Sequence, residues 1–134
     1  MSTDSLKYSK SNLNAYLELT KPSIIYLLVL TAATSMFLAE GFSSNLMQVV
    51  TGIIGIGLIA ASSAATNQIL DVSIDSKMKR TSRRPLVQNA IPTINAIIFA
   101  FSLLTVGSLI LLTFNNFLYW FLNFWSCVFY CLFY

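Results

Sequence analysis

The sequence has 134 residues, of which 56% are hydrophobic and only 10% are charged. A soluble domain normally carries about 25% charged residues, so this composition excludes an ordinary soluble globular protein and indicates a membrane protein. The net charge of +3 is small, and the basic residues lie beside apolar segments instead of covering a broad surface, which excludes nucleic acid as a partner.

The first segment, residues 1–20, is polar and rich in Ser and Asn. It lacks the basic start, short apolar core and small-residue cleavage site of a signal peptide, so we interpret it as a retained cytoplasmic N-terminal arm. Residues 12–18 would place Leu13, Tyr16 and Leu17 on one side of a helix. This pattern predicts a short interfacial helix, and a disordered tail is the alternative.

A first membrane helix is predicted over residues 22–39, which carry no charge and are mostly apolar. Their number is close to the ~20 residues that cross a hydrocarbon layer of about 30 Å. Pro22 suits a first helical turn, where its missing N–H would have no partner. Lys21 precedes the helix, and we expect it either to anchor the helix at the interface or to contact an anionic substrate.

A second membrane helix is predicted from Leu46, after a polar turn at residues 40–45, into a polar stretch at residues 67–86. This helix is rich in Gly, Ala and Ser, and such small residues let helix backbones approach closely in lipid. Ser63 lies four residues before Asn67. The face that leads into the polar stretch is therefore expected to point into the bundle.

Three polar residues of this stretch, Asn67, Asp71 and Asp75, are spaced four apart. On a helix they form one stripe, with each residue about one turn, ~6 Å, from the next. Two neighbouring carboxylates repel each other unless a cation lies between them. Mg²⁺ typically takes one or two carboxylates and fills its remaining positions with water and phosphate oxygens. The spacing therefore predicts a Mg²⁺ site.

Five cations follow the acids directly: Lys77, Lys79, Arg80, Arg83 and Arg84. The guanidinium fork binds phosphate in a bidentate manner, so acids for a metal beside arginines for an anion suit a metal–diphosphate. The alternative is an ordinary cytoplasmic loop whose basic residues only fix the orientation of the helices.

The pattern N-x-x-x-D-x-x-x-D over residues 67–75, followed by M-x-R-T-x-x-R-P-L over 78–86, closely resembles the first aspartate-rich motif of the UbiA-type intramembrane prenyltransferases. Residues 19–22, L-T-K-P, resemble the start of that family's first membrane helix. The resemblance extends over roughly residues 11–116, and within the family it is greatest to the branch that transfers a farnesyl group to haem.

The resemblance implies a fold and roles for individual residues. The family fold is all-α, a polytopic transmembrane bundle of about nine helices, of which this chain would hold the first three or four. Asn67, Asp71 and Asp75 match residues that hold Mg²⁺ and, through it, the diphosphate of farnesyl diphosphate; the two aspartates are therefore the catalytic candidates. Arg80 and Arg84 match residues that neutralise the departing diphosphate.

Further roles follow from the same resemblance. Lys21 becomes a candidate contact to the diphosphate, whereas Lys77, Lys79 and Arg83 are assigned to topology or to peripheral phosphate contacts. The reaction is ionisation of an allylic diphosphate and capture of the carbocation by a vinyl group of haem b, with addition of water. Metal and arginine would stabilise the leaving group electrostatically in a dry site.

The remainder of the chain is predicted to be membrane as well. Pro85 and Pro92 bracket a connection that cannot be a continuous helix, and a third membrane helix is expected from about Pro92 to Phe114. A fourth apolar stretch, residues 117–134, holds ten of the eighteen aromatic residues and both cysteines. Without a histidine anywhere in these 134 residues, a Cys/His zinc site and a histidine ligand to haem are excluded.

We divide the chain into the arm, residues 1–20, and a partial membrane domain, residues 21–134, with an atypical tail at 117–134. Since the family fold has a second aspartate-rich motif in its later half, we expect a truncated copy, frame-shifted after Asn116. A genuine short protein with an unusual tail is the alternative.

The distribution of basic residues predicts the orientation. Three Lys or Arg precede the first membrane helix, none follows it, five follow the second and none follows the third. The positive-inside rule therefore places the N-terminus and the aspartate-rich stretch on the cytoplasmic side of the inner (plasma) membrane.

The predicted function is transfer of a farnesyl group from farnesyl diphosphate to haem b. One alternative is a UbiA-type enzyme with a quinone-precursor or chlorophyllide acceptor, and another is an inactive membrane fragment. The basic part of the motif, M-x-R-T-x-x-R-P-L, favours haem over the aromatic acceptors. The sequence does not indicate the oligomeric state.

Overall fold

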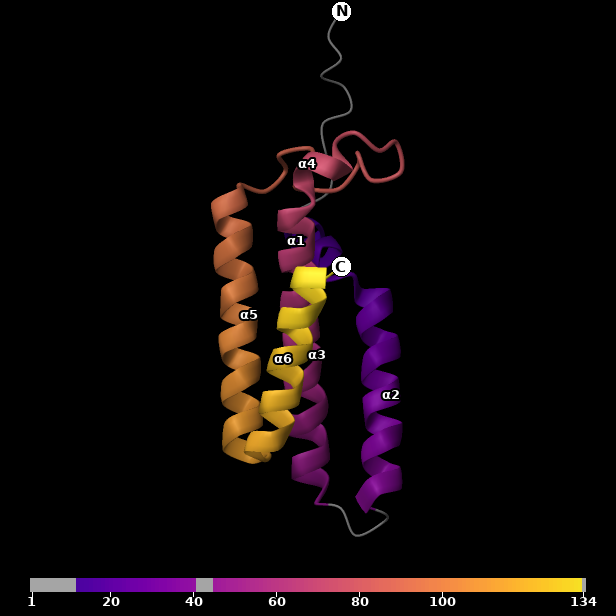
Figure 1. The fold of residues 1–134 in the computed structure, drawn as a ribbon, viewed down its shortest axis with the longest axis vertical. Coiled ribbons are helices and arrows are strands. Elements are labelled where there is room, and N and C mark those ends of the chain that lie inside the picture. Colours follow the sequence, from indigo (N-terminus) through magenta and orange to yellow (C-terminus); the bar gives the residue numbers. More distant parts are fainter. Residues whose placement is uncertain (1–11, 41–44, 134) are drawn as a thin grey trace, which may run out of the picture.

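The computed structural model describes residues 12–40 and 45–133, and within these residues it contains helices and turns but no strand (Figure 1). The all-α fold expected from the sequence is confirmed. Residues 1–11 of the arm, with Lys7 and Lys10, most of the predicted turn at 40–45, and Tyr134 lie outside the described residues. The helices are α1 (Asn12–Thr20), α2 (Pro22–Glu40), α3 (Leu46–Leu70), α4 (Val72–Asp75), α5 (Thr93–Phe114) and α6 (Phe117–Phe133).

Three of these helices, α2, α3 and α5, are long and apolar enough to cross a membrane. They coincide with the three membrane helices that the sequence predicts. The tail forms α6, which is apolar but has only 17 residues and is shorter than a full span. The chain is an integral membrane protein with three candidate spans and one shorter apolar helix in its described part.

α3 is the centre of the bundle. It packs most extensively against α5, which runs antiparallel to it, while α2 and α6 contact other parts of its surface (Figure 1). Two glycines permit the contact between α3 and α5. A Cβ atom on Gly107 would lie 2.9 Å from Ile59 Cγ1 and 3.1 Å from the carbonyl oxygen of Gly55. The small residues of α3 therefore act as predicted, by letting a neighbouring backbone approach.

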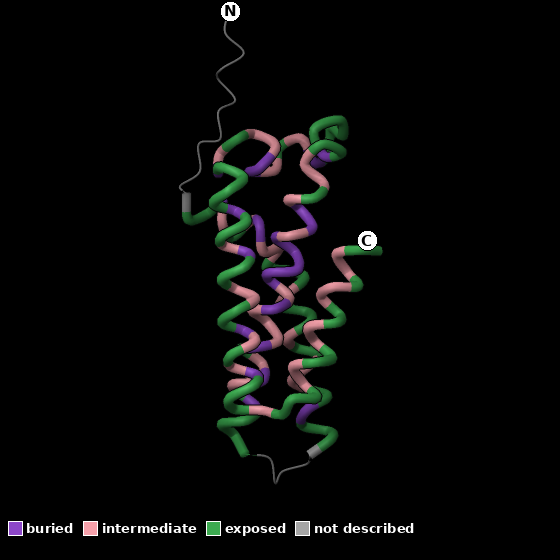
Figure 2. Tube along the Cα trace, turned by 60° about the vertical axis from the view of Figure 1, so that its left-hand side comes forward, coloured by how far each residue is buried: buried purple, intermediate pink, exposed green. Residues whose placement is uncertain are grey.

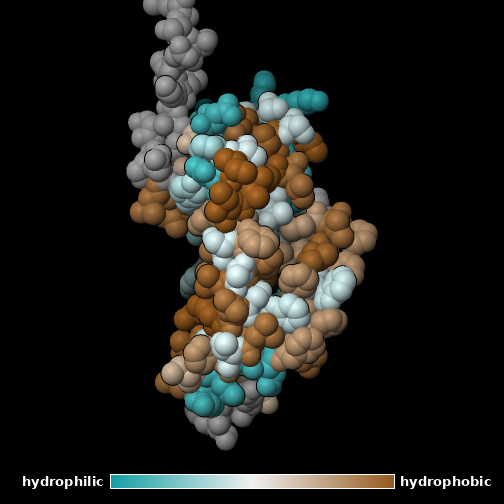
Figure 3. Space-filling view, turned by 90° about the vertical axis from the view of Figure 1, so that its left-hand side faces the viewer, coloured by the Kyte–Doolittle hydropathy of each residue, from teal (hydrophilic) through white to brown (hydrophobic). Residues whose placement is uncertain are grey.

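Buried residues concentrate along α3, whereas most residues of α2 and α6 are exposed (Figure 2). The exposed side chains are largely apolar, and hydrophilic colours gather toward the two ends of the molecule (Figure 3). Apolar surface along the length of a helix suits lipid, while polar residues at its ends suit the interfaces.

One end of the bundle collects α1, α4 and the connection to α5 (Figure 1). Its core is a cluster of buried apolar residues from α1, α3, the connection and α5: Ala15, Leu19, Ala65, Leu86, Ile91, Ala96 and Ala100. The short helix predicted at the N-terminus is confirmed as α1. Its Leu13 and Leu17 are exposed, and Tyr16 packs against Phe99 in a tilted ring contact with centroids 5.0 Å apart. This end is therefore a packed platform beneath the aspartate-rich stretch.

Candidate functional site

The acid stripe consists of Asn67, Asp71 and Asp75, and it lies where α3 passes into α4. α3 ends at Leu70, yet the backbone pattern of a helix continues across the break. The Asp71 N–H donates to the Asn67 carbonyl at 3.0 Å, and the Asp75 N–H donates to the Asp71 carbonyl at 2.8 Å. The predicted spacing of one helical turn is thereby kept, with Asn67 and Asp75 buried and Asp71 half-buried.

Asp75 is held by the chain that follows it. Arg84 Nη1 donates to Asp75 Oδ2 in an ion pair, and the Thr81 hydroxyl donates to the Asp75 carbonyl at 3.1 Å. Only 7% of the Asp75 side chain is exposed, so its charge requires a partner in this environment. The connection after α4 therefore folds back and returns a guanidinium to the acid stripe.

The remaining basic residues of the motif lie apart from this pair. Lys77, Lys79, Arg80 and Arg83 are all exposed. Arg80, which was predicted to act with Arg84, forms no ion pair with Asp71 or Asp75 in the described structure. The fold thus brings one of the two candidate arginines to the acids and leaves the other in solvent.

Lys21 comes to the same place from the turn between α1 and α2. Burial lowers the pKa of its ammonium group, the positive charge of Arg84 lowers it further, and Asp75 and Asp71 act in the opposite direction. Lys21 therefore lies within electrostatic reach of Arg84, Asp75 and Asp71. A mixed cluster of two acids and two cations forms at the cytoplasm-facing end predicted from the sequence.

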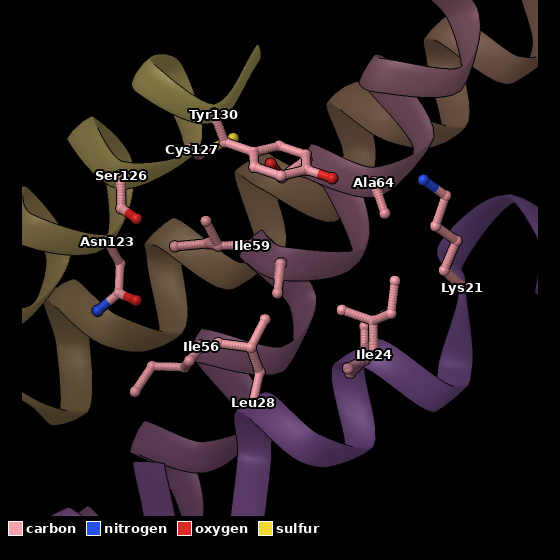
Figure 4. Close-up of a pocket in the computed structure, with 13 residues that line it drawn as sticks. Lys21, Ile24, Leu28, Ile56, Ile59, Ala64, Asn123, Ser126, Cys127 and Tyr130 are labelled. Carbon is pink, nitrogen blue, oxygen red and sulfur yellow. The ribbon is translucent and has the colours of Figure 1, made fainter. Parts of the chain in front are cut away.

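Lys21 also lines an apolar cavity of about 260 Å³ between α2, α3 and α6 (Figure 4). In the close-up, the Lys21 side chain reaches toward Ala64, and Tyr130 reaches toward the same end from the opposite wall. The walls are mostly aliphatic and carry a few polar groups from α6. The other lining residues are Ile24, Ile25, Leu28, Ile56, Ile59, Ala60, Ser63, Asn123, Ser126 and Cys127.

The donor set of the acid stripe consists of oxygen atoms. Among residues 12–40 and 45–133, no group of three or more His, Cys, Asp or Glu is arranged to hold a metal. Arg84 occupies Asp75 Oδ2 and leaves Oδ1, while Asp71 is in no ion pair within that part of the chain. A hard cation that needs only one or two carboxylates and takes its other ligands from water or phosphate could bind here.

Several residues at the site were not predicted from the sequence. Asn123, Ser126 and Tyr130 lie three or four residues apart and therefore share one face of α6, a spacing that could have been read within the aromatic tail. Thr81 belongs to the basic part of the motif, residues 78–86, but the hydrogen bond from its hydroxyl to the Asp75 carbonyl depends on how the connection after α4 folds. Gln68, whose side-chain amide donates hydrogen bonds to the carbonyl oxygens of Glu18 and Leu19 just before Lys21, had no sequence signal.

Comparison with known proteins gave matches at the level of both family and individual proteins. The profile of the UbiA prenyltransferase family matches residues 28–134, which includes α6. A protein named protoheme IX farnesyltransferase from Mycobacterium sp. (strain KMS) is 48% identical over 95 residues, which are 70% of this chain and 30% of the relative. No solved structure matches the chain.

Two further relatives bear the same name. The protein from Azotobacter vinelandii is 42% identical over 101 residues, 75% of this chain and 34% of the relative. The protein from Hahella chejuensis is 44% identical over 96 residues, 72% of this chain and 32% of the relative. This chain therefore spans about a third of the length of the curated relatives that it matches.

Proposed function

The chain belongs to the UbiA prenyltransferase family, and on that premise we propose that it carries the diphosphate-binding site of a transferase that moves a farnesyl group from farnesyl diphosphate to haem b. One observation carries the proposal: Lys21 belongs both to the charged cluster and to the wall of the apolar cavity. A prenyl diphosphate has the same two parts, an anionic head and a hydrocarbon chain, joined end to end.

The diphosphate head would bind at the acid stripe with Mg²⁺. The oxygen donors of Asn67, Asp71 and Asp75 fit this ion, since Mg²⁺ needs only one or two carboxylate ligands and completes its coordination shell with phosphate oxygens and water. When bound, the ion would neutralise negative charge on the diphosphate and make it a better leaving group. Asp71, which has no ion-pair partner in the described structure, is the carboxylate most available to it.

The cations of the cluster would act on the same head group. Arg84 is held by Asp75, so its guanidinium is already oriented when the substrate arrives. A preorganised donor of this kind stabilises the charge that develops on the departing diphosphate without reorganising during the reaction. Lys21 would add a second positive charge at the junction between head group and hydrocarbon. Arg80 would contribute from its exposed position as a peripheral contact.

The hydrocarbon chain would lie in the cavity between α2, α3 and α6. Its aliphatic walls suit a farnesyl chain, and its volume of about 260 Å³ is close to the lower end of pockets that hold small organic ligands, roughly 300–1,000 Å³. Apolar walls keep water away from the carbon that loses the diphosphate, and this protects a carbocation from hydrolysis. Haem b as acceptor is supported by the names of the relatives and by the basic part of the motif.

The experiment places the chain in lipid nanodiscs with Mg²⁺ and a non-hydrolysable farnesyl diphosphate analogue and measures binding. We expect saturable, Mg²⁺-dependent binding that Asp71→Asn abolishes and Asp71→Glu partly retains. In a chain extended to the length of its relatives and supplied with farnesyl diphosphate and haem b, farnesylated haem should be detected by mass, and Asp71→Asn should lower its formation by ~10²- to 10³-fold. Binding that persists in Asp71→Asn, or that needs no Mg²⁺, would contradict the proposed site.

A further inference from the structure

We propose that Gln68 is a positioning residue for Lys21: its side-chain amide clamps the end of α1 and thereby fixes the lysine between the acid stripe and the cavity. The inference rests on the proposed function, because it assigns Lys21 a task at the diphosphate. It adds a residue to which the proposed function gives no role.

The clamp is a pair of hydrogen bonds between helices that are distant in sequence. Gln68 Nε2 donates to the carbonyl oxygen of Glu18 at 3.1 Å and to that of Leu19 at 3.3 Å. These carbonyls belong to the last turn of α1, where backbone acceptors have no partner within the helix. Leu19 itself is completely buried in the core at this end of the bundle. The end of α1 is thus fixed by an apolar anchor and a polar one.

The residue that follows this anchored end adopts an unusual backbone conformation. Lys21 has φ 49°, in the left-handed region that residues with a Cβ atom rarely adopt. Its N–H approaches the Glu18 carbonyl at 3.4 Å, the same acceptor that Gln68 contacts. Such a conformation costs free energy and persists only where surrounding contacts impose it. Gln68 is one of the contacts that impose it.

Within the described part of the chain, the other half of the Gln68 amide has no partner. Its Oε1 atom is buried and accepts no hydrogen bond there, and the residue as a whole is only 3% exposed. A buried amide is costly unless its hydrogen bonds are made, so the two bonds from Nε2 are what retain it there. The donor function of the side chain, and not its acceptor function, is therefore the feature that matters.

The consequence for Lys21 follows from the geometry. With the turn fixed, its side chain lines the cavity within electrostatic reach of Asp71, Asp75 and Arg84. If the clamp is removed, the turn can relax toward an ordinary backbone conformation, and the lysine can turn toward water. Gln68 would therefore affect diphosphate binding only through Lys21.

The first arm of the test reports on Lys21 without any ligand. The lysines of the chain are reductively methylated with ¹³C, the Lys21 signal is assigned with Lys21→Arg, and the pKa of each lysine is measured by NMR in detergent. In the unmodified sequence, burial and the charge of Arg84 should lower the pKa of Lys21 from its ordinary value. Gln68→Met should move the Lys21 pKa back toward that value, and Gln48→Met, the same change at an exposed position of α3, should leave it in place.

The second arm measures affinity for the Mg²⁺–farnesyl diphosphate analogue in a double-mutant cycle of Gln68→Met and Lys21→Ala. Gln68→Met alone should weaken binding by about tenfold, corresponding to ~1.4 kcal/mol. In the Lys21→Ala background it should have no further effect. Equal losses in both backgrounds would show that Gln68 supports the fold in general, which would overturn the inference.

The two arms separate this inference from the proposed function. If the unmodified chain binds no diphosphate, the proposed function fails, and the NMR arm still decides the positioning role. An unchanged Lys21 pKa in a folded Gln68→Met variant would overturn that role. If Gln68→Met does not fold, Gln68→Leu, which is also neutral and cannot donate, takes its place with the same expected results.

Discussion

Arg80 and Arg84 are four residues apart in the same motif, yet the fold gives them different surroundings. Arg84 is paired with the nearly buried Asp75, and Arg80 is exposed. The spacing of the acids along a helix could be predicted, because the helical period depends only on residues close together in the sequence. The difference between the two arginines could not, because it depends on how the connection from Ser76 to Pro92 folds back over α4.

Replacing Arg84 by Ala should destabilise this end of the bundle more than replacing Arg80 by Ala. The first change leaves the Asp75 carboxylate without its partner in a place where 7% of its surface is exposed, which costs about 1–3 kcal/mol. Arg80→Ala is the matched control and should lie within about 0.5 kcal/mol of the unmodified chain. The rate of proteolysis within the connection, in detergent, measures the difference. Equal rates for the two variants would contradict the observed pairing.

Lys21 should make the proposed binding of diphosphate depend on pH. Burial and the charge of Arg84 lower the pKa of Lys21 in the free protein, although Asp75 and Asp71 oppose this effect. A bound diphosphate would favour the charged form and raise the pKa again. Binding should therefore take up protons between these two pKa values, and affinity should fall as pH rises through that window.

Calorimetric titration in buffers of different ionisation enthalpy measures this proton uptake. Lys21→Arg is the control, because arginine keeps the positive charge but does not titrate in proteins. Uptake that remains in the variant belongs to the diphosphate itself. If Lys21→Arg takes up as many protons as the unmodified chain, Lys21 is not linked to binding.

Among the elements, α3 could be predicted best and α6 least well. The small residues of α3 indicated close packing, and the structure shows where the packing is closest, at Gly55 and Gly107. The composition of the aromatic tail, residues 117–134, predicted an apolar membrane segment but did not indicate which helices it would contact. Its polar residues reach the cavity only because α6 turns back along α3 and α5, and this path is set by tertiary packing.

Glycine-to-alanine changes should separate packing from helix propensity. A Cβ atom on Gly55 would lie 2.7 Å from Leu111 side-chain atoms, and one on Gly107 would lie 3.1 Å from the Gly55 carbonyl oxygen. Both variants should lose roughly 1–3 kcal/mol of stability through overpacking. At Gly57 the nearest atom would be 3.4 Å away, an ordinary contact, so Gly57→Ala should gain up to ~1 kcal/mol from helix propensity.

Thermal unfolding of the three glycine variants in one detergent provides the comparison. The order of midpoints should be Gly57→Ala above the unmodified chain, with Gly55→Ala and Gly107→Ala below it. A Gly107→Ala variant as stable as Gly57→Ala would mean that α3 and α5 do not approach as closely as described.

The three candidate spans and the basic residues together predict an orientation for the whole molecule. Ser76 and Asn116 are both exposed. Ser76 directly follows α4 and Asn116 lies between α5 and α6, and these two places are at opposite ends of the bundle (Figure 1). Ser76 is beside the basic connection, which the positive-inside rule assigns to the cytoplasm. Single cysteines at these positions, in a chain with Cys127 and Cys131 replaced by Ala, should respond differently to a membrane-impermeant thiol reagent added to intact cells.

Asn116→Cys should be modified from outside, and Ser76→Cys should react only after the membrane is opened. Labelling of Ser76→Cys in intact cells would contradict this orientation and indicate the opposite one. It would place the acid stripe away from cytoplasmic farnesyl diphosphate and Mg²⁺.

The central claim is that one ligand spans the charged cluster and the apolar cavity, and photolabelling tests it directly. A farnesyl diphosphate analogue with a diazirine on its hydrocarbon chain is bound in nanodiscs with Mg²⁺, irradiated, and located by mass spectrometry. The account predicts Mg²⁺-dependent labels on the cavity walls, at Ile24 and Leu28 of α2 and Ile59 of α3, that are lost in Asp71→Asn. Labels spread over the outer face of α5, or unchanged in Asp71→Asn, would contradict it.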